Sequence, residues 1–179
     1  SSAEAELRFL LPPSDQTPPV WTHAERGSGY VVYSEIYNNA MWPKQVPKRE
    51  QIVDSVACRL ARDEYEPIQI GVFGVDSSEA LRQAKVAVDL DLPAEVRFIK
   101  YRERTTPRVG QSSKHLKHLG AAAAPYHLRL GDTLETIEPG HTGAFWITFH
   151  AAADATAQAS LDRILDKLKL AVSCASEPL

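Results

Sequence analysis

Hydrophobic and polar residues alternate along many short segments of this chain, which is the pattern of β-strands with one buried face. The clearest alternation covers residues 67–75, and similar patterns occur at 29–33, 55–60, 84–90, 96–101, 126–130 and 143–150. The tail also alternates from about 166 to 174. Since Gly, Pro and Asp separate these segments, the pattern predicts an all-β fold, an antiparallel β-sandwich of about 7–10 strands.

The segments between the predicted strands are long and carry at most short helical turns. We expect such turns at 48–53, after Pro47, and after 76–79, where Asp76 and Glu79 have capping-box spacing. Residues 105–125 do not alternate and are expected to form a long loop, with local helix around 114–124. A further loop or helical turn is expected at 158–165.

The chain divides into an N-terminal segment and a sandwich domain. Residues 1–28 hold a short apolar run, 7–11, expected to be an edge strand, and then a Pro-rich loop. Residues 29–179 form the predicted β-sandwich. Residues 177–179 lack the polar ending that is usual for a finished domain, so we expect the chain to be cut from a longer protein.

Composition and charge exclude several classes of function. Of the 179 residues, 44% are hydrophobic and 24% charged, and the net charge of -3 gives no basic field for nucleic acid. No apolar run approaches the roughly 20 residues of a membrane helix. Two cysteines, Cys58 and Cys174, allow one disulfide but no zinc site. The start at Ser1 indicates a processed secretory product or an excised piece.

Four segments occur in an order that is similar to a known family. They are GYVVY (29–33), a proline-broken loop ending in VP (46–47), DEYEPIQIGVFG (63–74) and PGHTGAFWITFHAAADA (139–155). Together they resemble the N-terminal β-sandwich of glycoside hydrolase family 123-like (β-N-acetylgalactosaminidase-like) bacterial proteins and related domains of unknown function. The matching positions in the last segment are Pro139, Gly140, Thr142, Phe145, Trp146, Ile147, Asp154 and Ala155. Asp63 departs from the family's glycine, and residues 156–160 depart from its usual turn.

The resemblance implies a non-catalytic module. In such proteins the sandwich precedes a (β/α)₈ barrel that carries the catalytic acids, and this chain ends before a barrel begins. We therefore expect no catalytic residue and no cofactor here, and a secreted or periplasmic protein whose C-terminal catalytic barrel is the main partner. Two alternatives are a free-standing carbohydrate-binding module and a structural sandwich without a ligand.

Three acidic residues, Asp63, Glu64 and Glu66, stand where a predicted strand begins. A glycosidase needs two carboxyl groups about 5–9.5 Å apart, and two acids on one strand face would allow this. We favour a structural role, in which the acids accept backbone N–H bonds or pair with Arg59 or Arg62. His115 and His118 have metal-ligand spacing, but Lys114 and Lys117 beside them disfavour a cation, and no metal is expected.

The candidate carbohydrate contacts are aromatic and amide residues in proline-broken loops. The apolar face of a sugar ring packs on an aromatic ring, and amides bond its hydroxyl groups. The candidates are Trp21, Tyr37, Trp42, Asn38 and Asn39. The same aromatic residues would also serve as contacts with the core or with an adjacent domain. A solvent-exposed row of them favours a binding module, and their burial favours a supporting one. Trp146, between Phe145 and Ile147, is expected to pack in the protein.

Overall fold

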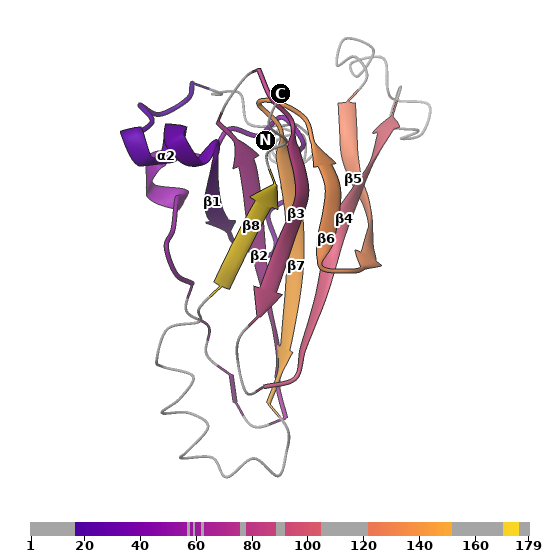
Figure 1. The fold of residues 1–179 in the computed structure, drawn as a ribbon. Helices are drawn as coiled ribbons and strands as arrows, with labels where there is room; N and C mark the ends of the chain where they lie inside the picture. Colours follow the sequence, from indigo (N-terminus) through magenta and orange to yellow (C-terminus); the bar gives the residue numbers. More distant parts are fainter. Residues whose placement is uncertain are drawn as a thin grey trace, which may run out of the picture.

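The computed structural model describes residues 17–56, 58, 60–61, 63–75, 78–88, 92–104, 122–151 and 170–175, without the side chains of 102–104, 122–126 and 170–175. Two antiparallel sheets carry the fold (Figure 1). The five-stranded sheet has the order β1-β2-β7-β4-β5, and the three-stranded sheet has the order β6-β3-β8. The strands are β1 (Tyr30–Glu35), β2 (Tyr65–Gly74), β3 (Leu81–Val88), β4 (Ala94–Arg104), β5 (Ala122–Leu130), β6 (Thr133–Ile137), β7 (Thr142–His150) and β8 (Leu170–Ala175).

Two short helical elements accompany the strands. The helix α2 (His23–Ser28) precedes β1, and the 3₁₀ turn η1 (Arg49–Gln51) lies between β1 and β2. A capping box begins α2, because the Thr22 side chain accepts from the Glu25 amide and the Glu25 carboxylate accepts from the Thr22 amide. The Arg49 guanidinium binds the same carboxylate, which ties η1 to α2.

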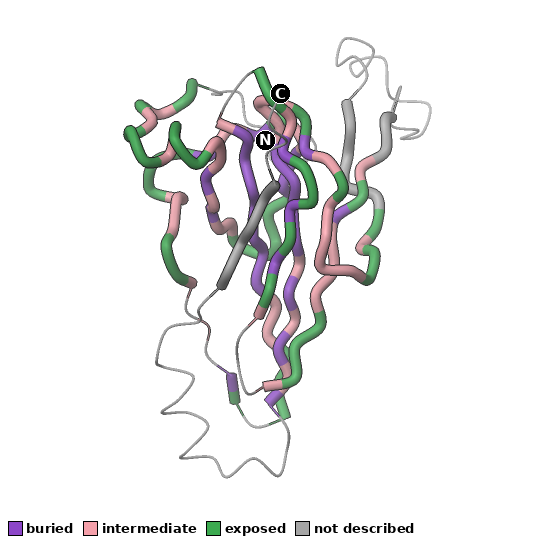
Figure 2. Tube along the Cα trace, in the orientation of Figure 1, coloured by how far each residue is buried: buried purple, intermediate pink, exposed green. Residues whose placement is uncertain are grey.

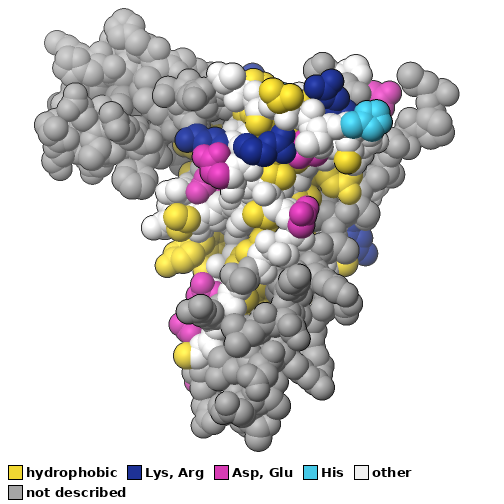
Figure 3. Space-filling view, turned by 90° about the vertical axis from the view of Figure 1, so that its left-hand side faces the viewer, with side chains coloured by type: hydrophobic (Ala, Val, Ile, Leu, Met, Phe, Trp, Pro, Cys, Tyr) yellow, Lys and Arg dark blue, Asp and Glu magenta, His cyan; other side chains and the backbone are white. Residues whose placement is uncertain are grey.

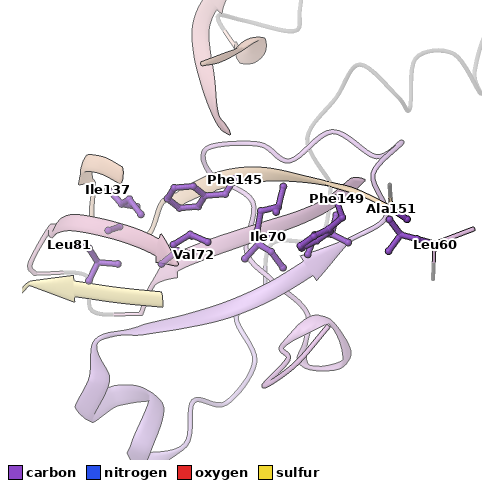
Figure 4. Close-up of a cluster of buried hydrophobic side chains, with 12 residues drawn as sticks. Leu60, Ile70, Val72, Leu81, Ile137, Phe145, Phe149 and Ala151 are labelled. Atoms are coloured by element: carbon purple, nitrogen blue, oxygen red, sulfur yellow. The ribbon is translucent and has the colours of Figure 1, made fainter. Parts of the chain in front are cut away.

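The main core fills the space between the two sheets. Alternate residues of β2 and β7, including Ile70, Val72 and Phe145, face β3 and β6, whose inward residues include Leu81 and Ile137 (Figure 4). Figure 2 shows that burial is concentrated on the central strands β2 and β7. Each fully buried large apolar side chain contributes about 1.5–3 kcal/mol relative to exposure, so this inner face stabilises the sandwich.

A second hydrophobic cluster lies on the outer face of the five-stranded sheet. It contains Val31, Tyr33, Met41, Phe73, Ile99 and Ala144. The loop that follows β1 covers part of this face and is tied down by buried polar groups. The Tyr33 hydroxyl donates to Thr142 Oγ1 at 3.1 Å, and Thr142 Oγ1 donates to the Gln45 carbonyl at 2.8 Å. Buried polar groups that are bonded in this way hold the loop in one position.

The predicted all-β fold with short helical turns is confirmed, and so are strands within 29–33, 67–75, 84–90, 96–101, 126–130, 143–150 and the tail. The turn expected at 48–53 is η1. The strand expected at 55–60 is wrong, because the described residues there lie outside the named strands. Its apolar residues are loop residues that cover the core: Leu60 is buried, and Val56 and Cys58 pack against it.

One helical prediction is also wrong, because the turn expected after Glu79 is the start of β3. Of the helix expected around 114–124, residues 122–124 belong to β5, and the rest lies outside the described residues. In β3 both Leu81 and Ala84 are buried, three residues apart, because the pairing register shifts between Arg82 and Lys85 and Gln83 has a positive φ of 49°. A bulge therefore produced the spacing of a helical turn. The expected edge strand 7–11, residues 105–121 and the turn 158–165 lie outside the described residues.

Candidate functional site

Two of the three candidate loop aromatics pack against the protein itself. Trp42 is buried, with 7% of its surface exposed. Trp21 is half-buried, and its ring stacks on that of Phe73 with centroids 5.7 Å apart. The Arg49 guanidinium lies 5.9 Å from the centroid of Trp21. The solvent-exposed row of aromatic residues is therefore absent from the described part of the chain.

The other three candidates line the same hollow as Trp146. Tyr37 is 51% exposed, and Asn38 and Asn39 follow it on the same turn. They line a hollow of about 290 Å³ on the outer face of the five-stranded sheet. We call it the outer hollow; its described lining residues are Tyr37, Asn38, Asn39, Ala40, Met41, Gln69, Ile99, His127, Leu128 and Trp146.

Strand alternation places Trp146 in this hollow. Phe145 and Ile147 are fully buried on the inner face of β7, so Trp146 points to the outer face and is only half-buried. Its cross-strand partners are Gln69 of β2 and Arg97 of β4. Trp146 is therefore partly packed in the protein, as expected, and it also lines the hollow.

Hydrogen bonds fix the turn that carries Asn39. The Asn39 amide N–H donates to the Ile36 carbonyl at 2.9 Å, and the Asn39 carbonyl accepts from Gln69 Nε2 at 2.8 Å. The Asn39 side-chain amide donates to Glu35 Oε1 at 3.0 Å. Since Gln69 is only 2% exposed, the turn is anchored to a buried group of the sheet. The hollow is therefore preorganised on the side of Asn39.

The described walls of the outer hollow consist of apolar, aromatic and amide side chains together with one imidazole. None of the described residues that line it is Asp, Glu, Lys or Arg, and His127 is the one imidazole among them. Such a lining suits an uncharged ligand, because an ionic ligand would lose hydration without gaining an ionic partner.

The acidic residues before β2 make local contacts. The Glu64 carboxylate accepts from the Ala61 amide, and Asp63 Oδ1 lies 3.2 Å from His150 Nε2. The His150 ring stacks on Tyr65, with centroids 4.1 Å apart. The predicted backbone N–H bond at the strand entrance is confirmed for Glu64. The predicted partners Arg59 and Arg62 lie outside the described residues.

No group of three or more His, Cys, Asp or Glu side chains that could hold a metal ion occurs among the described residues. His115 and His118 are outside them. Cys58 is half-buried, and burial together with the nearby Glu66 charge raises the pKa of its thiol. The Cys174 side chain lies outside the described residues, so nothing here tests the disulfide that the two cysteines allow.

On the face that carries α2 and β1, side chains of both signs lie interspersed with hydrophobic ones (Figure 3). No described helix is both long and apolar enough to cross a membrane.

No protein-family model matches the chain, and no curated protein matches it. The resemblance to glycoside hydrolase family 123-like sandwiches stays a prediction.

Proposed function

We propose that this chain is a non-catalytic β-sandwich module of a secreted glycoside hydrolase-like protein, and that it supports a neighbouring catalytic domain. The expected sandwich fold supports the proposal, as does the position of two of the four segments that carry the resemblance. Residues 63–74 contribute β2 and residues 139–155 contribute β7, and these strands pair at the centre of the five-stranded sheet. The resemblance therefore lies in the part of the sequence that builds the core.

The observation that carries the proposal is the burial of the loop aromatics. Trp42 is buried and Trp21 stacks on Phe73, so both residues stabilise the sandwich. A module that acts chiefly by binding along a glycan chain would present a row of such rings to solvent. The Glu64 carboxylate is bound to a backbone amide, which favours a structural role for it.

The supporting role predicts thermal coupling between the sandwich and its neighbour. Differential scanning calorimetry should compare the 179-residue chain with the complete product of its gene. We expect the sandwich to unfold at a higher temperature in the complete product, in one transition with the catalytic domain, because an interface adds to the stability of both parts. The proposal is wrong if the gene encodes no further domain, or if the sandwich unfolds at the same temperature attached and alone.

A further inference from the structure

We propose that the outer hollow binds one uncharged pyranose ring of a glycan. This inference adds to the supporting role and does not depend on it, because support requires no ligand. It rests on the size of the hollow, its two aromatic walls, its fixed amide groups and its lack of charge.

The size fits a single ring. Pockets for drug-sized ligands have volumes of about 300–1,000 Å³, and the outer hollow, at about 290 Å³, is just below that range. A longer oligosaccharide would extend beyond the hollow onto the surrounding surface. The glycan therefore has one anchored ring.

The aromatic walls fit the apolar face of a sugar. Tyr37 projects from the turn after β1 and is half exposed, and Trp146 lies on β7 in the sheet below. The C–H groups on one face of a pyranose pack on an aromatic ring, and this contact removes apolar surface of both partners from water. Because Tyr37 and Trp146 lie on two different elements, their rings together define how deep in the hollow a sugar ring would lie.

The polar groups fit hydroxyl groups. The Asn38 side-chain amide makes no hydrogen bond to another described residue, so both its donor and acceptor atoms are free for a ligand. The Asn39 side chain donates to Glu35 and keeps its carbonyl oxygen as an acceptor. Since the turn is already anchored through Gln69, a ligand would order little of it on binding.

The neutral lining decides between ligand classes. A nucleotide would also stack on aromatic rings, but its phosphate needs Lys, Arg or a backbone anion site, and no described lining residue is Lys or Arg. A wholly apolar ligand would bury the amides without partners, at a cost of about 1–3 kcal/mol for each group. A neutral polyhydroxylated ring with one apolar face satisfies both the aromatic rings and the amides.

A glycan array followed by a binding titration tests this inference. The array should carry neutral and acidic glycans at high surface density, because a contact with one ring is weak and multivalent display compensates. Neutral methyl glycosides of the sugars that bind should then be titrated into the protein, and binding should be followed by NMR. We expect saturable binding of neutral glycans, weakened about tenfold or more by Tyr37→Ala, as for truncation of an aromatic anchor.

Two further variants keep the outcome clear. Asn38→Ala should weaken binding with the fold intact, since Asn38 is exposed. Tyr65→Ala is the matched control, because Tyr65 is also an exposed tyrosine but does not line the hollow, and it should bind as the unmodified chain does. No binding of any neutral glycan would overturn the inference, and so would binding that both Tyr37→Ala and Asn38→Ala leave unchanged.

Discussion

Replacing Gly71 with alanine should destabilise the sandwich strongly, because the ring of Tyr33 occupies the place of the missing side chain. Gly71 pairs with Tyr33 across β1 and β2. A Cβ atom on Gly71 would lie 2.9 Å from Tyr33 Cδ1 and closer still to Cε1 and Cζ. Tyr33 is fully buried, and its hydroxyl holds Thr142, so the ring has no free space into which to move.

The expected cost has two parts. Forcing an extra carbon into a packed core costs about 1–3 kcal/mol. Displacing the ring breaks the bond from Tyr33 to Thr142, and an unsatisfied buried hydroxyl costs about 1–3 kcal/mol more. The total of about 2–6 kcal/mol is a large share of the roughly 5–15 kcal/mol by which a domain is stable.

Urea denaturation, followed by tryptophan fluorescence and circular dichroism, measures this loss. Gly27→Ala is the matched control, because Gly27 lies in α2 and a Cβ there meets nothing within 4 Å, so alanine should be neutral or stabilising by up to about 1 kcal/mol. In a Tyr33→Leu background, which removes the outer ring atoms, the cost of Gly71→Ala should fall below about 1 kcal/mol. A loss below about 1 kcal/mol in the unmodified background would refute the reasoning.

Two more predictions follow from the packing around the loop aromatics and from α2. Trp42→Ala should lower the free energy of unfolding by about 3–5 kcal/mol, because the Trp42 ring is buried. Tyr37→Ala should change it by no more than about 0.5 kcal/mol, because the Tyr37 ring is half exposed. Equal effects of the two variants in urea denaturation would contradict this assignment. The bond from Arg49, followed by that from the Thr22 amide, lowers the pKa of Glu25 from 4.5 to about 2, so its contribution to stability is present above pH 4.5 and is lost as the pH falls toward 2. Glu25→Gln should therefore be less stable than the unmodified chain at pH 6, and this difference should shrink as the pH falls from 4.5 toward 2 and in high salt. A difference in stability that does not vary with pH would show that the charge of Glu25 contributes nothing to stability.

The alternation of hydrophobic and polar residues predicted the strands correctly wherever their pairing is regular. In β2 and β7 every second residue belongs to the main core, as Ile68, Ile70 and Val72 do in β2, so a period of two was visible in the sequence. The start of β3 was hidden by the bulge at Gln83, which brings Leu81 and Ala84 to the same face. The helix α2 was missed although Thr22 and Glu25 have the spacing of a capping box, because the prolines before it indicated a loop.

The candidate site could be predicted only in part. Tyr37 and Trp42 are five residues apart in a proline-broken loop, where no periodicity tells which side chain faces the protein. Tertiary contacts decide it: Trp42 is buried and Tyr37 is exposed. Trp146 could have been found, since alternation with Phe145 and Ile147 places it on the outer face, opposite the polar Gln69. That Trp146 and Tyr37 line the same hollow depends on how the loop crosses the sheet, which no local pattern in the sequence records.

The central claim is that this sandwich is an accessory domain and not the catalyst. The most direct test is an assay for hydrolysis of aryl N-acetylhexosaminides. The assay compares the 179-residue chain, the complete gene product and its Glu64→Gln variant, in which the amide oxygen can still accept from the Ala61 N–H. We predict turnover by the complete product, the same turnover by the variant, and none by the 179-residue chain. Turnover by the 179-residue chain that Glu64→Gln abolishes would contradict the account and make the acidic entrance of β2 a catalytic site.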